Sequence, residues 1–171
     1  MCIYSRDEIE EILTKYGDKI YRMAFIQVKR PEVADDIYQE VCMKLIQQKT
    51  RIEPDEHLKA WLLRTTINCC KDYWKSSWIQ KISWGENQET NDVFENAVEE
   101  SQETGYLTEC VQKLPEKYRT AIHLYYYEGY SQKEIAALLG EKENTVASWM
   151  KRGKERLKRM LEKSEVEAYE F

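Results

Sequence analysis

Residues 142–159 could bind the phosphates of nucleic acid, because seven of their side chains are basic and only two are acidic. They follow a spacing that is typical of a helix-turn-helix. Ala136 is small enough for two helices to pack closely, Gly140 tolerates the positive φ of a turn, and the branched Val146 can face the first helix. A second helix of this kind reads base edges in the major groove from its N-terminal end.

The candidate DNA-binding side chains are the polar and basic residues expected on the outer face of that second helix. They are Lys142, Asn144, Thr145, Ser148, Lys151, Arg152, Lys154 and Arg156. Base contacts would specify the site and phosphate contacts would position the helix. Glu141 and Lys142 occupy the turn, where an apolar residue and a Ser-type N-cap would be more favourable. Asn144 could cap the second helix instead. A plain helical hairpin with a solvated basic end is the alternative interpretation.

A second segment, residues 59–81, combines aromatic rings with five basic side chains and one acid. The rings are Trp61, Tyr73, Trp74 and Trp78, and the cations among them are Arg64, Lys71 and Lys75. Bases of single-stranded DNA stack on such rings while cations hold the backbone. Trp61 stands beside Leu62 and is favoured as a core residue, so the segment suggests single-strand binding without deciding it.

Residues for catalysis or metal binding are scarce. His57 and His123 are the two histidines, they fall in different expected domains, and there is no Gly-rich phosphate loop. The five cysteines are odd in number and form no C-x-x-C pair. We therefore expect no catalytic residue, no metal and no cofactor, with the thiols reduced and buried as small apolar groups.

Charge and hydropathy bear on location and partners. No apolar run approaches the length that spans a bilayer, and residues 1–7 contain no apolar signal core, so we expect a cytoplasmic protein without membrane insertion. The net charge of −5 alone would argue against nucleic-acid binding. The charge is divided into blocks, however: +4 over residues 59–81, −8 over 82–110 and +5 over 142–159.

Scarce Gly and Pro, with apolar residues recurring every three or four positions, predict an all-α protein. The predicted helices cover residues 5–30, 31–48, 57–76, 107–114, 116–128, 132–139 and 144–162, with a capping box formed by Ser131 and Glu134. We expect two small helical domains, 1–80 and 106–163, joined by a flexible acidic linker, 81–105, and followed by a tail, 164–171. A solvated helix is the alternative for the linker.

Several fragments stand in an order that resembles one family. They are Ala34-Asp35-Asp36-Ile37-Tyr38-Gln39-Glu40-Val41, Trp61-Leu62 through Asn68, Asp72-Tyr73, Leu114-Pro115 through Arg119, and the helix-turn-helix. Together they resemble an extracytoplasmic-function RNA polymerase sigma factor of the sigma-70 family. The departures are Trp74-Lys75 after Asp-Tyr, and Glu141-Lys142 in the turn, and both leave the promoter preference unpredictable.

The resemblance implies that residues 1–80 correspond to sigma region two. Its second helix would bind the beta-prime clamp helices of core RNA polymerase through Asp35, Asp36, Gln39 and Glu40. By itself, this acidic cluster would be read as a solvated face near a helix N-terminus. The loop 49–56 and the third helix would recognise and open the −10 element. The candidates there are Arg51, Lys59, Arg64, Asn68, Lys71 and Tyr73.

The resemblance also implies that residues 106–163 correspond to region four, which reads the −35 element. The linker would run toward the active-site and RNA-exit channels of the polymerase. The implied partners are core RNA polymerase (beta-prime clamp helices and beta flap), promoter DNA and an anti-sigma factor, which could hold the protein at the membrane of a bacterial cell. The chain would bind and would catalyse nothing.

A conventional helix-turn-helix repressor or activator with an N-terminal effector domain is the second hypothesis. It explains the C-terminal half equally well. It does not explain two separate basic blocks, because a duplex reader needs one DNA surface, usually doubled by dimerisation.

Overall fold

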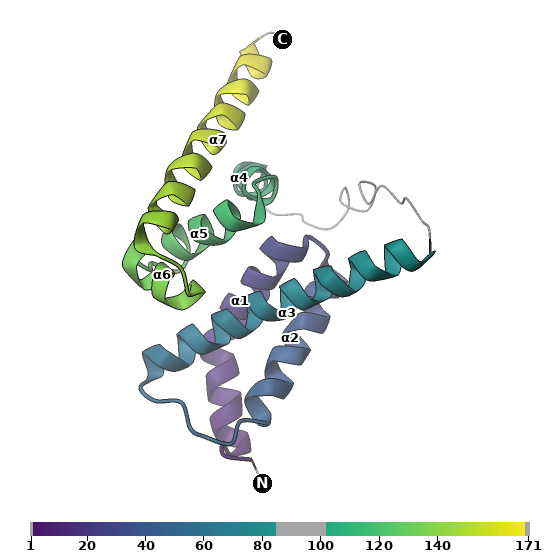
Figure 1. The fold of residues 1–171 in the computed structure, drawn as a ribbon, viewed down its shortest axis with the longest axis vertical. Helices are drawn as coiled ribbons and strands as arrows, with labels where there is room; N and C mark the ends of the chain where they lie inside the picture. Colours follow the sequence, from purple (N-terminus) through teal and green to yellow (C-terminus); the bar gives the residue numbers. More distant parts are fainter. Residues whose placement is uncertain (1, 85–101, 170–171) are drawn as a thin grey trace. The chain divides into compact units, whose positions relative to one another are not determined.

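The computed structural model describes residues 2–84 and 102–169, and the side chains of residues 2–76 and 105–163 (Figure 1). Within these ranges the chain forms seven helices and no strand. The helices make two compact units, one of α1 to α3 and the other of α4 to α7. The predicted all-α class is therefore confirmed, whereas most of the predicted linker, residues 85–101, lies outside the described residues.

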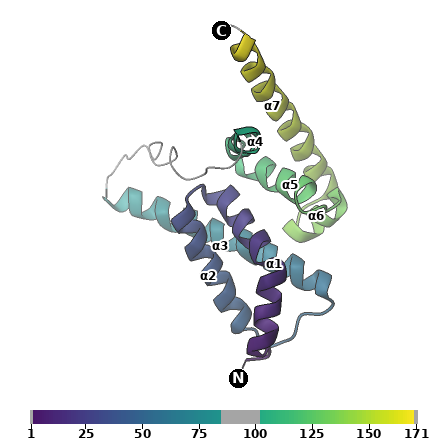
Figure 2. The same ribbon diagram turned by 180° about the vertical axis from the view of Figure 1, so that it is seen from behind.

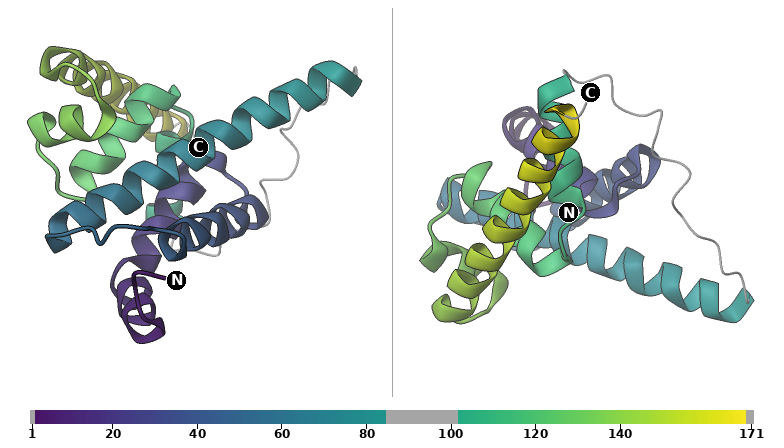
Figure 3. Two further views of the ribbon diagram at one scale, coloured as in Figure 1. Left: turned by 60° about the horizontal axis from the view of Figure 1, so that its bottom comes forward. Right: turned by 90° about the horizontal axis from the view of Figure 1, so that it is seen from above.

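The first unit contains α1 (Arg6–Val28), α2 (Pro31–Ile46) and α3 (Asp55–Trp84), and each helix contacts the other two. In Figure 1 α3 passes in front of α1 and α2, and in Figure 2 it lies behind them, so α1 and α2 pack on one side of α3. The third helix ends at Trp84, beyond the predicted end at residue 76. Figure 3 shows this C-terminal end of α3 projecting past α1 and α2.

Local signals explain where these helices begin and end. The Ser5 hydroxyl accepts from the Glu8 backbone N–H at 3.2 Å, and the Glu8 carboxylate accepts from the Ser5 backbone N–H at 2.7 Å, which is a capping box. Pro31 is the first residue of α2, as predicted. Between α1 and α2, Lys29 has a φ of 63°. A lysine rarely adopts this left-handed conformation, and it was not predicted from the sequence.

The core of the first unit is built from one stripe of each helix. The apolar residues that recur every three or four positions in α1 and α2 pack there, with Tyr16, Ile20, Ile37, Val41 and Leu45 buried and Ile9, Ile12, Leu13 and Val33 partly buried. Trp61 is partly buried against the same core, which confirms its interpretation as a core residue. Each helix therefore leaves its opposite face in solvent.

The second unit contains α4 (Gln102–Gln112), α5 (Glu116–Tyr126), α6 (Gln132–Leu139) and α7 (Glu143–Tyr169). The predicted capping box at Ser131 is present, since its hydroxyl accepts from the Glu134 N–H at 3.1 Å and the Glu134 carboxylate accepts from the Ser131 N–H at 3.2 Å. The helix predicted at residues 107–114 is present as α4, which begins earlier and ends at Gln112; Val111 and Leu114 are buried, whereas Leu107 is 39% exposed.

Two features that the sequence analysis missed fix how α4, α5 and α7 pack. Gly153 is buried in α7, and a Cβ added there would lie 2.5 Å from Cδ1 of Ile122, so α5 and α7 approach closely. The guanidinium of Arg119 is buried and donates to the carbonyl of Gln112 at 3.1 Å, which satisfies an acceptor at the end of α4.

Replacing the glycine between α6 and α7 tests the packing of the second unit. Gly140 has a φ of 69°, so Gly140→Ala should lower the free energy of unfolding of this unit by about 1–2 kcal/mol. Gly140→Asn should lower it less, because asparagine tolerates this conformation. Urea unfolding followed by amide resonances of α6 and α7 measures the change, with α1 resonances as the internal control. An alanine variant as stable as the parent would contradict the prediction.

Thiol accessibility tests the burial of the cysteines. Cys2 is exposed, whereas Cys69, Cys70 and Cys110 are buried, and burial raises the pKa of the Cys69 thiol to about 11. At pH 8 iodoacetamide should therefore label Cys2 in the native protein, and the three buried thiols only after denaturant is added. Mass spectrometry of the digested protein locates the label. Labelling of Cys69 at the rate of Cys2 would show that the first unit is open.

Candidate nucleic-acid interfaces

The helix-turn-helix geometry is present in the second unit. Ala136 and Val146 are both buried, which confirms their predicted packing roles. Gly140 ends α6 in a left-handed conformation, its N–H and that of Glu141 both donating to the Ala136 carbonyl. Asn144 is not the cap of the second helix, because α7 begins at Glu143 and Asn144 lies inside the first turn.

The eight predicted DNA-binding residues lie in α7 or, for Lys142, just before it, and the packed face of α7 is formed by Val146, Met150 and Gly153. Seven of the eight are exposed, and Thr145 is half-buried. The exposed residues are Lys142, Asn144, Ser148, Lys151, Arg152, Lys154 and Arg156. The structure thus brings polar and basic side chains together at the N-terminal half of α7, where a groove-reading helix needs them.

Aromatic rings lie against two of these cations. The Nζ of Lys154 lies 5.5 Å from the ring centre of Tyr125 and 5.6 Å from that of Tyr126. The guanidinium of Arg156 lies 5.4 Å from the ring of Tyr118. Cation–π attraction restrains these side chains on the flanks of α7, next to α5. These rings were not predicted from the sequence, although the tyrosine run 125–127 was an available signal for two of them.

A basic stripe, defined as Arg64, Asn68, Lys71 and Lys75, runs along the exposed side of α3. The spacing of four, three and four residues places these side chains on one face of a helix. Of the other predicted −10 candidates, Lys59 and Tyr73 are half-buried. The ring of Tyr73 meets that of Trp74 edge to face at 5.6 Å, and Trp74 is 40% exposed. The side chain of Trp78 lies outside the described residues.

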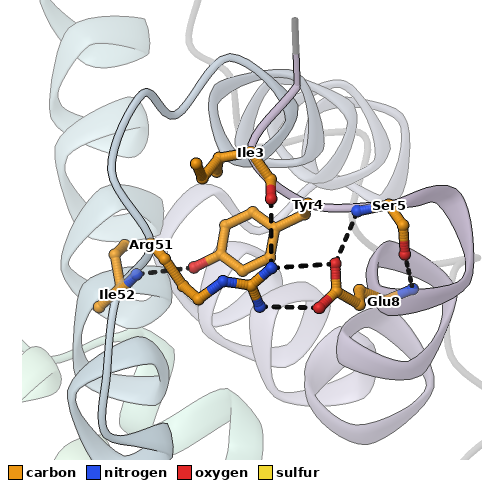
Figure 4. Close-up of polar contacts among 6 residues, drawn as sticks. All are labelled: Ile3, Tyr4, Ser5, Glu8, Arg51 and Ile52. Atoms are coloured by element: carbon orange, nitrogen blue, oxygen red, sulfur yellow. Dashed lines mark hydrogen bonds and ion pairs between the residues drawn. The ribbon is translucent and has the colours of Figure 1, made fainter.

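Arg51, the remaining candidate, contacts the N-terminal segment of the chain. Its guanidinium donates to both carboxylate oxygens of Glu8, at 2.7 and 3.2 Å, and to the carbonyl of Ile3 at 3.2 Å (Figure 4). It also lies 5.0 Å from the ring centre of Tyr4. The structure therefore gives Arg51 partners within the protein, at Glu8, Ile3 and Tyr4.

An acidic face on α2 carries the residues proposed from sequence for polymerase binding. Asp35, Asp36, Gln39 and Glu40 are all exposed, on the side opposite the buried Ala34, Ile37, Val41 and Leu45. Met43 follows one turn after Gln39 and is 51% exposed, so an apolar group adjoins the acids. Glu40 also forms an ion pair with Lys44 at 3.7 Å. The sequence analysis did not single out Met43.

The structure gives His123 a place in the core. It is buried in α5, its Nε2 lies 3.7 Å from a carboxylate oxygen of the buried Glu128, and its ring stacks on Tyr127 at 5.0 Å. In the part of the chain whose side chains are described, no group of three or more His, Cys, Asp or Glu residues could hold a metal ion. No described helix is long and apolar enough to cross a membrane.

Each of the two units matches a known family model. The model "Sigma-70 region 2" matches residues 12–79, and the model "Sigma-70, region 4" matches residues 104–157. Three relatives from Bacillus subtilis match nearly the whole chain. RNA polymerase sigma factor SigZ is 28% identical (90% of this chain and 87% of the relative), and sigma factor SigV is 27% identical (90% and 91%). ECF RNA polymerase sigma factor SigM is 29% identical (88% and 93%).

Solved structures give the same fold. The sigma factor RpoE of Bartonella quintana, in complex with the anti-sigma factor NepR, matches with a TM-score of 0.72 at 22% identity, over 90% of this chain and 96% of that one. CnrH, in complex with the cytosolic domain of CnrY, matches with a TM-score of 0.67 at 19% identity, over 92% and 90%. With both sigma regions present in family order, the chain belongs to the sigma-70 family of RNA polymerase sigma factors, within its extracytoplasmic-function group.

Proposed function

We propose that this sigma factor binds core RNA polymerase through the acidic face of α2 and engages promoter DNA at two separate surfaces. The basic stripe of α3, with the loop between α2 and α3, would recognise and open the −10 element. The N-terminal half of α7 would read the −35 element. The domain boundaries, 1–80, 81–105, 106–163 and 164–171, belong to this proposal.

One observation carries the proposal: two independent basic surfaces lie on two separate folding units of one chain. A repressor that reads one duplex site needs one such surface per protomer. A protein that must contact two promoter elements at once needs two. The exposed cations at Arg64, Lys71 and Arg152 supply one set on each unit.

The surface on α3 suits unpaired DNA. Trp74 is exposed beside the basic stripe, so a base could stack on its ring while Lys71 and Lys75 neutralise phosphates. Such contacts are made only once the duplex opens, and their free energy offsets the cost of unstacking. Promoter opening by this route needs binding energy and no hydrolysis, which fits a chain for which we propose no enzymatic role.

The acidic face of α2 suits a basic partner that also has an apolar contact. Asp36 and Gln39 present oxygens toward solvent, and Met43 adds an exposed apolar group on the same side. Charged groups at such a rim mainly steer association, whereas an apolar anchor supplies affinity. We assign this face to the beta-prime clamp helices of the polymerase, and a further contact of the second unit to the beta flap.

An anti-sigma factor is the remaining partner that we propose. RpoE, which shares the fold of this chain, was solved with the anti-sigma factor NepR, and CnrH was solved with the cytosolic domain of CnrY. The bacterial cytoplasm, where the polymerase works, is the proposed location, with an anti-sigma partner able to hold the protein at the membrane.

Transcription with purified components tests the polymerase contact. We expect the protein, added to bacterial core polymerase and a fragment library of the host genome, to create specific start sites. Asp36→Ala combined with Gln39→Ala should reduce these transcripts about ten-fold or more, because both side chains lie in the proposed interface. Run-off products are counted by sequencing their ends.

The matched control is Asp18→Ala, which removes an exposed acid from α1 instead. It should leave transcription unchanged. No start sites with the parent protein, together with tight dimeric binding to a palindromic duplex without polymerase, would favour the conventional regulator. Equal transcription by the double variant would remove the acidic face from the interface.

Salt-dependent DNA binding tests the surface of α7. Lys151→Gln should weaken binding of the holoenzyme to every −35 sequence alike and reduce the slope of log affinity against log salt by about 1. Ser148→Ala should instead relax the preference at one base pair. Lys163→Gln, exposed near the far end of α7, is the control and should change neither quantity. A uniform effect of all three variants would contradict base reading by this helix.

A further inference from the structure

The loop of residues 49–54 between α2 and α3 is attached to the N-terminal segment of the chain. The backbone N–H of Ile52 donates to the hydroxyl of Tyr4 at 2.8 Å. The guanidinium of Arg51 forms a two-pronged ion pair with Glu8 and lies over the ring of Tyr4 (Figure 4). These contacts join positions more than forty residues apart in the sequence. The conformation of the loop therefore depends on Tyr4, which precedes α1, and on Glu8 in its first turn.

The N-terminal partner is itself held in place. Glu8 takes part in the capping box with Ser5. The same carboxylate therefore caps the N-terminus of α1 and accepts from Arg51. The hydrogen bonds from Arg51, and then that from the Ser5 backbone, lower the pKa of Glu8 to about 2. Glu8 is consequently ionised at every pH at which transcription is measured, and the ion pair is constant under those conditions.

A second attachment fixes the other end of the loop. Asp55, the first residue of α3, accepts from the Nζ of Lys15 at 2.5 Å and from the hydroxyl of Tyr16. Both donors belong to α1. The loop is thus tied to Tyr4 through Ile52, to α1 through Arg51, and to α1 again just beyond its end at Asp55. A loop ordered in advance loses less conformational entropy when it captures a ligand than a free one does.

The charges around the loop favour a role for Arg51 in holding the loop in place over a role in contacting DNA. A hollow of about 260 Å³ lies between the loop and α1, and four carboxylates line it together with the single guanidinium of Arg51. The carboxylates are those of Glu8, Glu11, Glu53 and Asp55. DNA phosphates would be repelled there. Arg51, which is bonded to Glu8 in the lining of this acidic hollow, is suited to restraining the loop.

We propose that Tyr4 and Glu8 are positioning residues for −10 recognition, holding the loop through Ile52 and Arg51 in the shape that captures unpaired bases. The inference rests on the proposed function, which gives this loop its DNA target. Neither residue contacts DNA in this scheme. Both act through the backbone and side chain of the loop.

The test uses the full chain bound to core polymerase. The probe is a single-stranded oligonucleotide carrying the non-template −10 sequence of a fragment selected in the transcription assay. Glu8→Gln keeps a capping-box residue but loses the ionised partner of Arg51, and Tyr4→Phe keeps the ring but loses the acceptor for Ile52. Each should weaken oligonucleotide binding about five-fold and reduce discrimination against a single-base change.

A matched control separates positioning from simple electrostatics. Glu10→Gln removes the same charge from the same helix, where Glu10 pairs only with the exposed Arg6 among the interactions described for its carboxylate. Loss of an acid near DNA should by itself strengthen binding slightly. We therefore expect Glu10→Gln to bind as tightly as the parent or more tightly, and Glu8→Gln to bind less tightly, a difference in sign that charge alone cannot produce.

Two further readouts complete the design. Affinity for core polymerase and for a −35 duplex should stay unchanged in both variants, because neither surface involves the N-terminal segment. Parental binding of the −10 oligonucleotide by either variant, or a gain for Glu8→Gln equal to that for Glu10→Gln, would overturn the positioning role while leaving the proposed function intact. A parent holoenzyme that fails to bind the oligonucleotide at all would overturn both.

Discussion

Each helix of this protein must bury one stripe of side chains to be stable, and that constraint decides where every functional residue can lie. In α2 the burial of Ala34, Ile37, Val41 and Leu45 leaves Asp36 and Gln39 in solvent. In α7 the burial of Val146 and Met150 does the same for Ser148 and Arg152. Short helices gain most of their stability from such packing and little from intrinsic propensity. The buried stripe of each helix thus determines which side chains face solvent. A change in either core would turn the helix and move the polar surface that it carries.

The sequence was informative where local rules are strict. Helix starts at Ser131 and Pro31 followed from side-chain chemistry, and the turn at Gly140 followed from the need for positive φ. Spacing alone identified the buried Ala136 and Val146 and the exposure of most candidate residues on α7. The family resemblance supplied what periodicity could not, namely which partner each exposed face meets. The residue roles at these faces stay predictions.

Long-range contacts were beyond reach of the sequence. Nothing near Arg51 indicates that its partner is Glu8, because the pair forms only after α1 and the loop have packed together. Leu107 has the helical spacing of the buried Val111 and Leu114 and is nevertheless 39% exposed. The burial of His123 likewise depends on how the helices of the second unit pack, although its neighbour Glu128 is close to it in the sequence. Periodicity identifies a face, but it cannot identify what that face will meet.

The close approach of α5 and α7 at Gly153 has a consequence for how this sequence can change over time. A glycine within a long helix costs about 1 kcal/mol relative to alanine, yet a methyl group here would overlap Cδ1 of Ile122. Positions 122 and 153 therefore share one volume, and side-chain size at one limits the size at the other. A drift toward alanine at 153 would be accepted only together with a smaller residue at 122, so the two positions should vary as a pair among descendants of this chain.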